Sequence, residues 1–194
     1  TLWEKKSLWP RIIIAFIPTA FVGFFLYDYI RGFLLGNTMV TLAALLIGGI
    51  ILILVERFYK EEKHHIQSPE KLSYRASFLI GTIQALSVIP GVSRSASSIL
   101  GGMFLGASRK TAVEFSFFLA IPTVMAASGL DLLKSNLSFS LYEWNILLVG
   151  FTGSFLVAHF VIKFFLSYVQ KHSFTVFGVY RILLAIVYWF LLVR

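Results

Sequence analysis

The sequence contains no cysteine, which excludes disulfide bonds and metal sites built from thiolates. Charged residues are also scarce: they make up 13% of the 194 residues, whereas a soluble domain carries about a quarter. Hydrophobic residues reach 58%, and the mean hydropathy is +0.83. These proportions exclude an ordinary soluble domain and predict a single integral-membrane domain over residues 1–194.

Acidic residues are few as well, with 9 Asp and Glu against 17 Lys and Arg, which gives a net charge of +8. Such a balance also occurs in proteins that bind nucleic acid, but here the basic residues lie at the ends of apolar blocks. That placement is typical of membrane topology and of contact with lipid headgroups. We therefore expect no nucleic-acid partner.

Five apolar blocks reach the roughly 20 residues that cross a bilayer core of about 30 Å. We expect spans near residues 11–30, 38–55, 111–130, 144–165 and 174–193. The fold class that follows is all-α, a polytopic transmembrane helical bundle. Since the first residue is Thr1 rather than Met, we also expect the chain to be truncated at its N-terminus.

Residues 76–107 break this pattern, because 32 residues are too many for one span and too few for two. Pro90 lacks an amide hydrogen and Gly91 tolerates unusual backbone angles, so we expect a break there and a re-entrant pair of half-helices. Re-entry places 12 basic residues on one side and 3 on the other, against 10 and 5 for a single crossing. The positive-inside rule therefore favours re-entry, with the N-terminal end in the cytoplasm.

The turn after this break, IPGVSRSASS, holds an arginine at membrane depth. A charge there costs at least ~2.5–3.5 kcal/mol, so Arg94 needs an anionic partner or water. Its guanidinium matches phosphate oxygens, and a helix beginning near Ser95 to Ser97 would add unpaired amides and the positive end of its dipole. Gly91 lets a ligand approach the backbone, and hydroxyls come from Ser93, Ser95, Ser97 and Ser98. The turn predicts a phosphate or diphosphate site.

The same residues allow structural alternatives. The serines and glycines can simply cap and pack the helix, with Arg94 bridged to Glu114. Glu114 is either an interfacial acid or an inward-facing partner. Arg181, eight residues into the last expected span, either snorkels to the interface or braces the bundle.

The turn belongs to a longer set of motifs. They are Gln84, IPGVSRS at 89–95, Gly101-Gly102, Ser108-Arg109-Lys110, AVEFSFFLAIP at 112–122 and VYRI at 179–182. Through them the chain resembles, from about Trp9 to Arg194, the bacterial undecaprenyl-diphosphate phosphatase family, known as the bacitracin-resistance type. One residue departs from the family pattern, since Ala96 stands where Gly usually follows Ser-Arg-Ser.

The resemblance implies hydrolysis of undecaprenyl diphosphate, a C55 polyprenyl diphosphate lipid, to undecaprenyl phosphate and inorganic phosphate. This reaction recycles the lipid carrier for peptidoglycan synthesis and confers bacitracin resistance. The resemblance also implies a multi-pass protein of the bacterial inner membrane whose site opens toward the periplasmic side. Its fold is the second half of an inverted repeat, and a homo-oligomer is compatible with it.

We expect Arg94, Ser93 and Ser95 to be catalytic. The residues expected to bind substrate are Gly91, Ser97, Ser98, Gln84 and Glu114. The resemblance implies a divalent cation, Mg²⁺ or Ca²⁺, whose glutamate ligands lie with an acid/base histidine in a segment ahead of Thr1, so we expect the 194 residues alone to be inactive. Because broken helices that meet at a site also build transporters, a transporter or flippase for an anionic lipid or substrate is the alternative.

Overall fold

The structure is a computed structural model that describes residues 6–26, 29–59, 65–134, 140–169 and 172–192. Within these ranges the regular structure is helical, apart from one isolated β-bridge between Ile66 and Ala107. The α-helices are α1 (Trp9–Phe25), α3 (Thr38–Phe58), α4 (Tyr74–Ala85), α5 (Arg94–Phe104), α6 (Arg109–Lys134), α7 (Leu141–Val169) and α8 (Thr175–Leu192). A π-helical turn (Ile30–Leu34) and two 3-10 turns (Pro69–Lys71, Leu86–Val88) accompany them. The predicted all-α class is confirmed.

Three of the described helices, α3, α6 and α7, are long and apolar enough to cross a membrane, and α1 and α8 are shorter apolar helices. Large apolar side chains face outwards along them, as Phe151 and Leu148 of α7 do with 73% and 64% of their surface exposed. Apolar surface on this scale is stable in lipid, so the chain is an integral-membrane helical bundle. These five helices lie on the five predicted spans, although α1 ends at Phe25 rather than near residue 30. That each of them crosses the bilayer stays a prediction.

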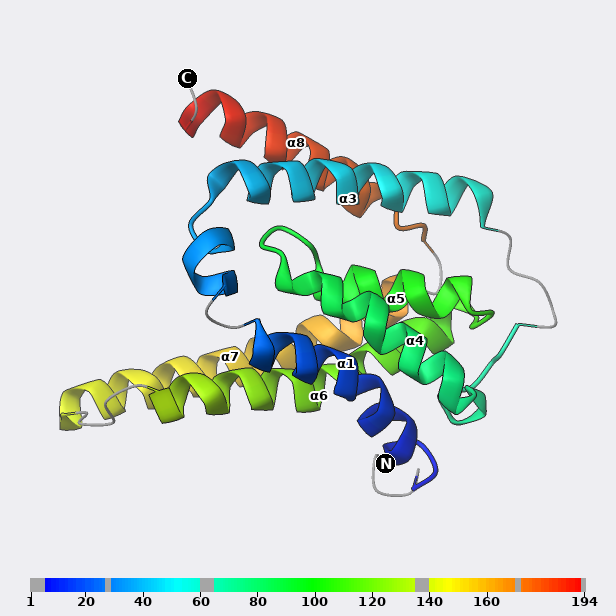
Figure 1. Cartoon of the computed structure of the whole chain (residues 1–194), viewed down its shortest axis with the longest axis horizontal. Coiled ribbons are helices and arrows are strands. Elements are labelled where there is room, and N and C mark those ends of the chain that lie inside the picture. The colour runs from blue at the N-terminus through cyan, green and yellow to red at the C-terminus, as the bar shows by residue number, and fades with distance from the viewer. Residues whose placement is uncertain (1–5, 27–28, 60–64, 135–139, 170–171, 193–194) are drawn as a thin grey trace.

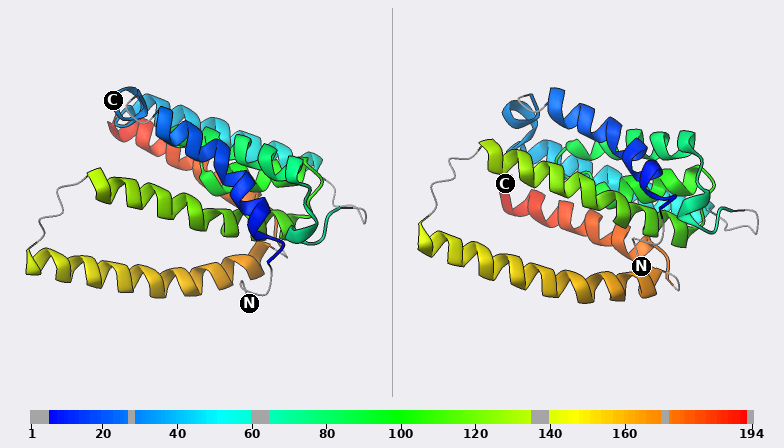
Figure 2. Two further views of the ribbon diagram at one scale, coloured as in Figure 1. Left: turned by 60° about the horizontal axis from the view of Figure 1, so that its bottom comes forward. Right: turned by 90° about the horizontal axis from the view of Figure 1, so that it is seen from below.

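The helix pair α4 and α5 lies between α3 on one side and α6 on the other (Figure 1). α3 and α8 run side by side, and α1 packs across α4 and against α6. α7 diverges from α6 over much of its length (Figure 2) and contacts it near the α7 C-terminal end, where Phe165 packs edge-to-face on Phe117. The apolar core lies where α1, α4 and α6 meet and includes Ile12, Ile80 and Phe115.

The two ends of the α4–α5 pair lie beside each other. Ile66, ahead of α4, donates its amide to the carbonyl of Gly106 after α5 at 2.8 Å, and accepts from the amide of Ser108 at 2.9 Å. At 1.5 Å per residue the helices are only about 18 and 16 Å long, roughly half the hydrocarbon core. The chain thus enters and leaves the pair at one end, and re-entry into the membrane stays a prediction.

The turn between the two helices differs in detail from the prediction. α4 gives way to a 3-10 turn at Leu86–Val88, and Ile89 is extended (φ −72°, ψ 122°) because a residue before proline avoids the helical region. The second helix begins at Arg94, and not near Ser95 to Ser97 as predicted. The reason is that Ser93 occupies the N-cap, where its hydroxyl accepts from the amide of Ala96 at 3.3 Å. Arg94 therefore lies in the first turn of α5.

Candidate phosphate-binding site

The tip of the hairpin, residues 89–93, packs against the N-terminal part of α3. Gly91 has φ +89°, in the left-handed region that favours glycine. A Cβ at this position would lie 2.4 Å from the carbonyl oxygen of Thr41 and 3.0 Å from the Cβ of Ala44. Glycine is therefore required here both by the backbone conformation and by the close approach of α3.

The N-terminus of α5 points its unpaired amides at the tip. Ser93 closes the first turn, since its carbonyl accepts from the amide of Ser97 at 2.9 Å and its hydroxyl caps Ala96. The amides of Arg94 and Ser95 have no acceptor among the described residues. Two free amides at the positive end of a helix are the donors that an anion binds. Ala96 is helical, so its methyl group, absent from the family's usual glycine, creates no backbone strain.

Arg94, the first residue of α5, adds a buried cationic donor. The residue is half-buried, and its Nη1 is buried without a hydrogen-bond partner in the described part of the chain. Leaving such a donor unsatisfied costs about 1–3 kcal/mol or more for a charged group. Within the described ranges no ion pair joins Arg94 to Glu114, so the structural bridge between them is not formed. An anionic ligand would satisfy the free guanidinium nitrogen.

The predicted serines divide into two groups. The hydroxyls of Ser93 and Ser95 lie 3.2 Å apart at the helix start, and Ser95 is exposed. The hydroxyls of Ser97 and Ser98 bond other groups of the protein instead. Ser97 donates to the carbonyl of Ser93, in the preceding turn, at 3.0 Å. The buried Ser98 hydroxyl lies 2.7 Å from the hydroxyl of Ser116 on α6. The structure therefore brings Ser93 and Ser95 to Arg94, and gives Ser98 a packing contact. Substrate binding by these serines stays a prediction.

Gln84 and Glu114 are the remaining residues predicted to bind substrate. Gln84 is fully buried, and its Nε2 donates to the hydroxyls of Thr19 on α1 (3.2 Å) and Thr123 on α6 (3.3 Å). Its Oε1 is buried and has no partner in the described ranges. Glu114 is half-buried, two residues before Ser116 and so about 200° around α6 from the contact with Ser98. Their roles in binding also stay predictions.

Arg181 decides one alternative that the sequence left open. Its Nη2 donates to the carbonyl oxygens of Gly91 at 2.6 Å and Ala44 at 3.2 Å, so it braces the bundle and does not snorkel to the interface. The sequence did not reveal this contact. Arg181 and Gly91 are 90 residues apart, and no local pattern links an arginine on α8 to the turn.

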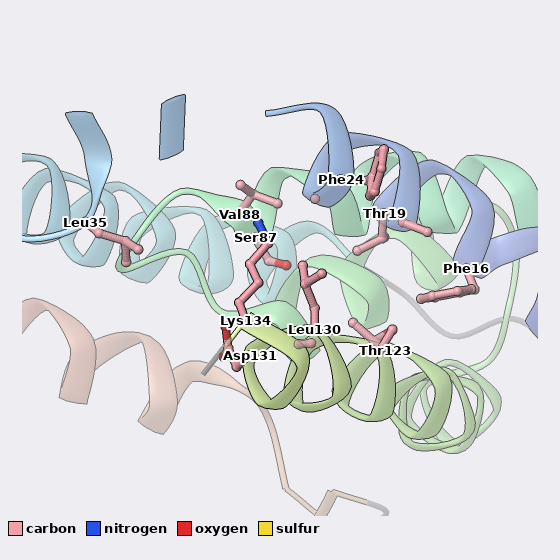
Figure 3. A pocket seen from close by; sticks show the side chains of 14 residues that line it. Phe16, Thr19, Phe24, Leu35, Ser87, Val88, Thr123, Leu130, Asp131 and Lys134 are labelled. Carbon is pink, nitrogen blue, oxygen red and sulfur yellow. The ribbon is translucent and has the colours of Figure 1, made fainter. Parts of the chain in front are cut away.

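Two cavities flank the tip. A groove of 480 Å³ lies between α3 and α5, next to Ser93 and Arg181, and its other lining side chains are almost all apolar. A second cavity, of 780 Å³, lies between α1, the Leu86–Val88 turn and α6, and its lining includes Thr19, Thr123 and Lys134 (Figure 3). The hairpin tip therefore separates an apolar groove from a more polar space.

The described residues offer no ligand group for a metal ion. No set of three or more His, Cys, Asp or Glu side chains comes together in the described ranges. These residues do not fit the divalent cation that the resemblance implies, so the chemistry available here is anion binding by nitrogen donors.

Comparison with known proteins agrees with these motifs. A family model described as bacitracin resistance protein BacA matches residues 3–187. The chain is 51% identical to the undecaprenyl-diphosphatase of Aquifex aeolicus over 187 residues, which cover 96% of this chain and 73% of that protein. It is 45% identical to the undecaprenyl-diphosphatase of Sulfurihydrogenibium sp., with 97% and 75% covered. It is 46% identical to undecaprenyl-diphosphatase 1 of Clostridioides difficile, with 97% and 69% covered.

Proposed function

Because the chain belongs to the bacitracin resistance protein BacA family, we propose that it hydrolyses undecaprenyl diphosphate to undecaprenyl phosphate and inorganic phosphate. This reaction recycles the lipid carrier of peptidoglycan synthesis and confers bacitracin resistance. The family membership confirms the resemblance seen in the IPGVSRS and AVEFSFFLAIP motifs. The observation that carries the proposal is the buried Nη1 of Arg94, which has no hydrogen-bond partner among the described residues and belongs to the first turn of α5, where two backbone amides are also free.

Cleavage of a diphosphate requires the charge on the transferred phosphoryl group to be neutralised. Arg94 performs this role, because its guanidinium offers two nitrogen donors to the nonbridging oxygens. The amides of Arg94 and Ser95 hold the same phosphoryl group at the positive end of α5. The hydroxyls of Ser93 and Ser95 orient its oxygens. These donors are fixed by the fold before the lipid arrives, so the site needs little reorganisation in the transition state.

The groove between α3 and α5 supports a place for the lipid tail. It begins at Ser93, at the start of α5, and its further lining along that helix is Ser97 and the apolar side chains of Ala96, Leu100 and Phe104. A diphosphate held at the tip thus has its first isoprene units in contact with α3 and α5. We place the protein in the bacterial inner membrane with this site toward the periplasmic side, as the family implies, and the count of basic residues supports a cytoplasmic N-terminal end.

A divalent cation, Mg²⁺ or Ca²⁺, belongs to the proposal through the family, but the described residues do not supply its ligands. We assign the glutamate ligands and an acid/base histidine to residues other than those that the structure describes. On this assignment the described residues hold the phosphate-binding half of the site, and the hydrolytic step needs both parts.

The test measures phosphate release from undecaprenyl diphosphate by the complete gene product in detergent with Mg²⁺. Arg94→Ala is expected to lower kcat at least ~100-fold, since removing one donor to a developing charge costs about 2.7–4 kcal/mol. Arg75→Ala is the matched control, because Arg75 is an exposed arginine at the opposite end of the hairpin, and its activity should stay within about twofold. The 194 residues alone, run in parallel, should release no phosphate.

Near-normal turnover by Arg94→Ala would make Arg94 a structural residue and defeat the proposal. The same preparation in vesicles separates hydrolysis from transport. Movement of labelled undecaprenyl diphosphate to the other leaflet without phosphate release would favour the transporter or flippase instead.

A further inference from the structure

We propose that Arg181 is a positioning residue for the phosphate donors: it holds the Pro90–Gly91 turn so that Arg94 and the start of α5 face the diphosphate. The inference rests on the proposed phosphatase function. It assigns to α8, the last helix of the chain, a part in a site formed by the α4–α5 hairpin.

Arg181 reaches the turn from another helix. Its Nη2 donates to the carbonyl oxygen of Gly91 at 2.6 Å, a short contact from a charged donor. The same nitrogen donates to the carbonyl oxygen of Ala44 on α3 at 3.2 Å. One guanidinium nitrogen therefore links the turn to α3, and Gly91 is only three residues before Arg94.

The path of the Arg181 side chain depends on small residues of α3. A Cβ at Gly48 would lie 2.6 Å from Nη2 of Arg181, so the guanidinium crosses α3 where that helix has no side chain. Just beside it, α3 and α8 meet backbone to backbone: a Cβ at Gly49 would lie 2.7 Å from the carbonyl oxygen of Gly178. Because α3 and α8 are in close contact, the side chain of Arg181 extends over Gly48 towards the turn.

The turn is held from two directions as a result. α3 contacts Gly91 through the backbone of Thr41, and Arg181 bonds the Gly91 carbonyl. Loss of the second contact leaves the turn in place against α3 but free to rotate its peptide planes. Because Arg94 lies only three residues after Gly91, such a rotation moves its guanidinium. A misplacement of 1 Å in a catalytic group costs about 100-fold in rate.

A direct contact with the diphosphate is the competing role for Arg181. Its Nε is buried without an acceptor in the described residues, so it retains a free donor. The two roles differ in how Arg181 and Arg94 combine. A residue that acts only through Arg94 matters little once Arg94 is absent, whereas an independent binding residue, or a general loss of folded protein, lowers the rate by the same factor in both backgrounds.

The experiment is a double-mutant cycle on the complete gene product, followed by phosphate release from undecaprenyl diphosphate. Arg181→Ala is expected to lower kcat about 10- to 100-fold in the wild-type background and less than about twofold in the Arg94→Ala background. Arg181→Lys, which keeps a charged donor for one carbonyl, should stay within about fivefold of wild type. Equal factors in the two backgrounds would overturn the inference.

A second variant covers the case in which Arg181→Ala does not fold. Gly48→Ala keeps the arginine at position 181 but puts a methyl group 2.6 Å from its Nη2, and it should reproduce the loss in kcat and its dependence on Arg94. Gly153→Ala in α7, where a Cβ meets nothing within 4 Å, is the control and should keep wild-type activity. Equal activity of these two variants would also overturn the inference. If wild type releases no phosphate at all, the proposed function fails, and not this inference alone.

Discussion

The substitution Gly91→Ala tests the role of the turn by adding a single methyl group to it. Gly106→Ala supplies a matched comparison, because both glycines have nearly the same backbone angle, φ +89° and φ +86°. A Cβ at Gly106 meets nothing within 4 Å, whereas a Cβ at Gly91 would lie 2.4 Å from the carbonyl oxygen of Thr41. The two substitutions therefore share the conformational cost and differ in the clash with α3.

The magnitudes follow from this geometry. A left-handed conformation costs a residue with a Cβ roughly 1–2 kcal/mol, so both variants should lose about that much stability. At Gly91 the turn must also retreat from α3 by about 1 Å, from 2.4 Å to the 3.4 Å of ordinary contact. Since a 1 Å misplacement of catalytic groups costs about 100-fold, we expect Gly91→Ala to lower kcat about 100-fold and Gly106→Ala to leave it within about twofold.

The assay is phosphate release from undecaprenyl diphosphate by the complete gene product, together with thermal unfolding in the same detergent. Unfolding separates the shared loss of stability from the loss of rate, because kcat is measured well below either midpoint. Equal kcat for Gly91→Ala and Gly106→Ala would show that contact between the turn and α3 does not set the position of Arg94. The argument for the phosphate donors would then lose its geometric basis.

Two further substitutions test the groove and the packing beneath the site. Ala43→Trp, at an exposed position of α3 that lines the groove, should raise KM for undecaprenyl diphosphate about tenfold by filling the space for the tail. Ala158→Trp, on the exposed surface of α7, should leave KM unchanged, and equal effects would contradict the lipid groove. Ser98→Ala leaves the buried Ser116 hydroxyl without its 2.7 Å partner and should lower the free energy of unfolding by about 1–3 kcal/mol. Adding Ser116→Ala should cost less than the sum of the single changes, so additive losses in thermal unfolding would contradict the contact.

Much of the fold could be predicted because lipid imposes strong rules on sequence. The apolar blocks predicted the helices, and Pro90 with Gly91 predicted the break, because each acts through its own backbone. Arg94 stood out for the same reason, as a charge without a local partner. The helix start was wrong by one to three residues, since Ser93, Ser95 and Ser97 are all competent caps and the sequence does not choose between them.

The remaining parts of the site depend on contacts between distant segments. Ser97 and Ser98 look alike in the sequence, and both bond a carbonyl of the preceding turn, yet Ser98 also bonds a serine on α6. Gln84 joins threonines of two other helices, which carry no motif of their own, and its predicted role in substrate binding stays a prediction. The sequence allowed two roles for Arg181, at the membrane interface or inside the bundle. Its contacts with Gly48 and with the carbonyl of Gly91 decide for the second role.

The contact of Gly49 with Gly178 has one more consequence. With no side chains between their backbones, α3 and α8 are expected to tilt as one rigid body in the bilayer. Gly91 contacts both helices, because it packs against Thr41 of α3 and its carbonyl oxygen accepts from Arg181 of α8. A change in membrane thickness would therefore change the depth at which the site binds the diphosphate headgroup. The distances between the nitrogen donors of the site would stay the same.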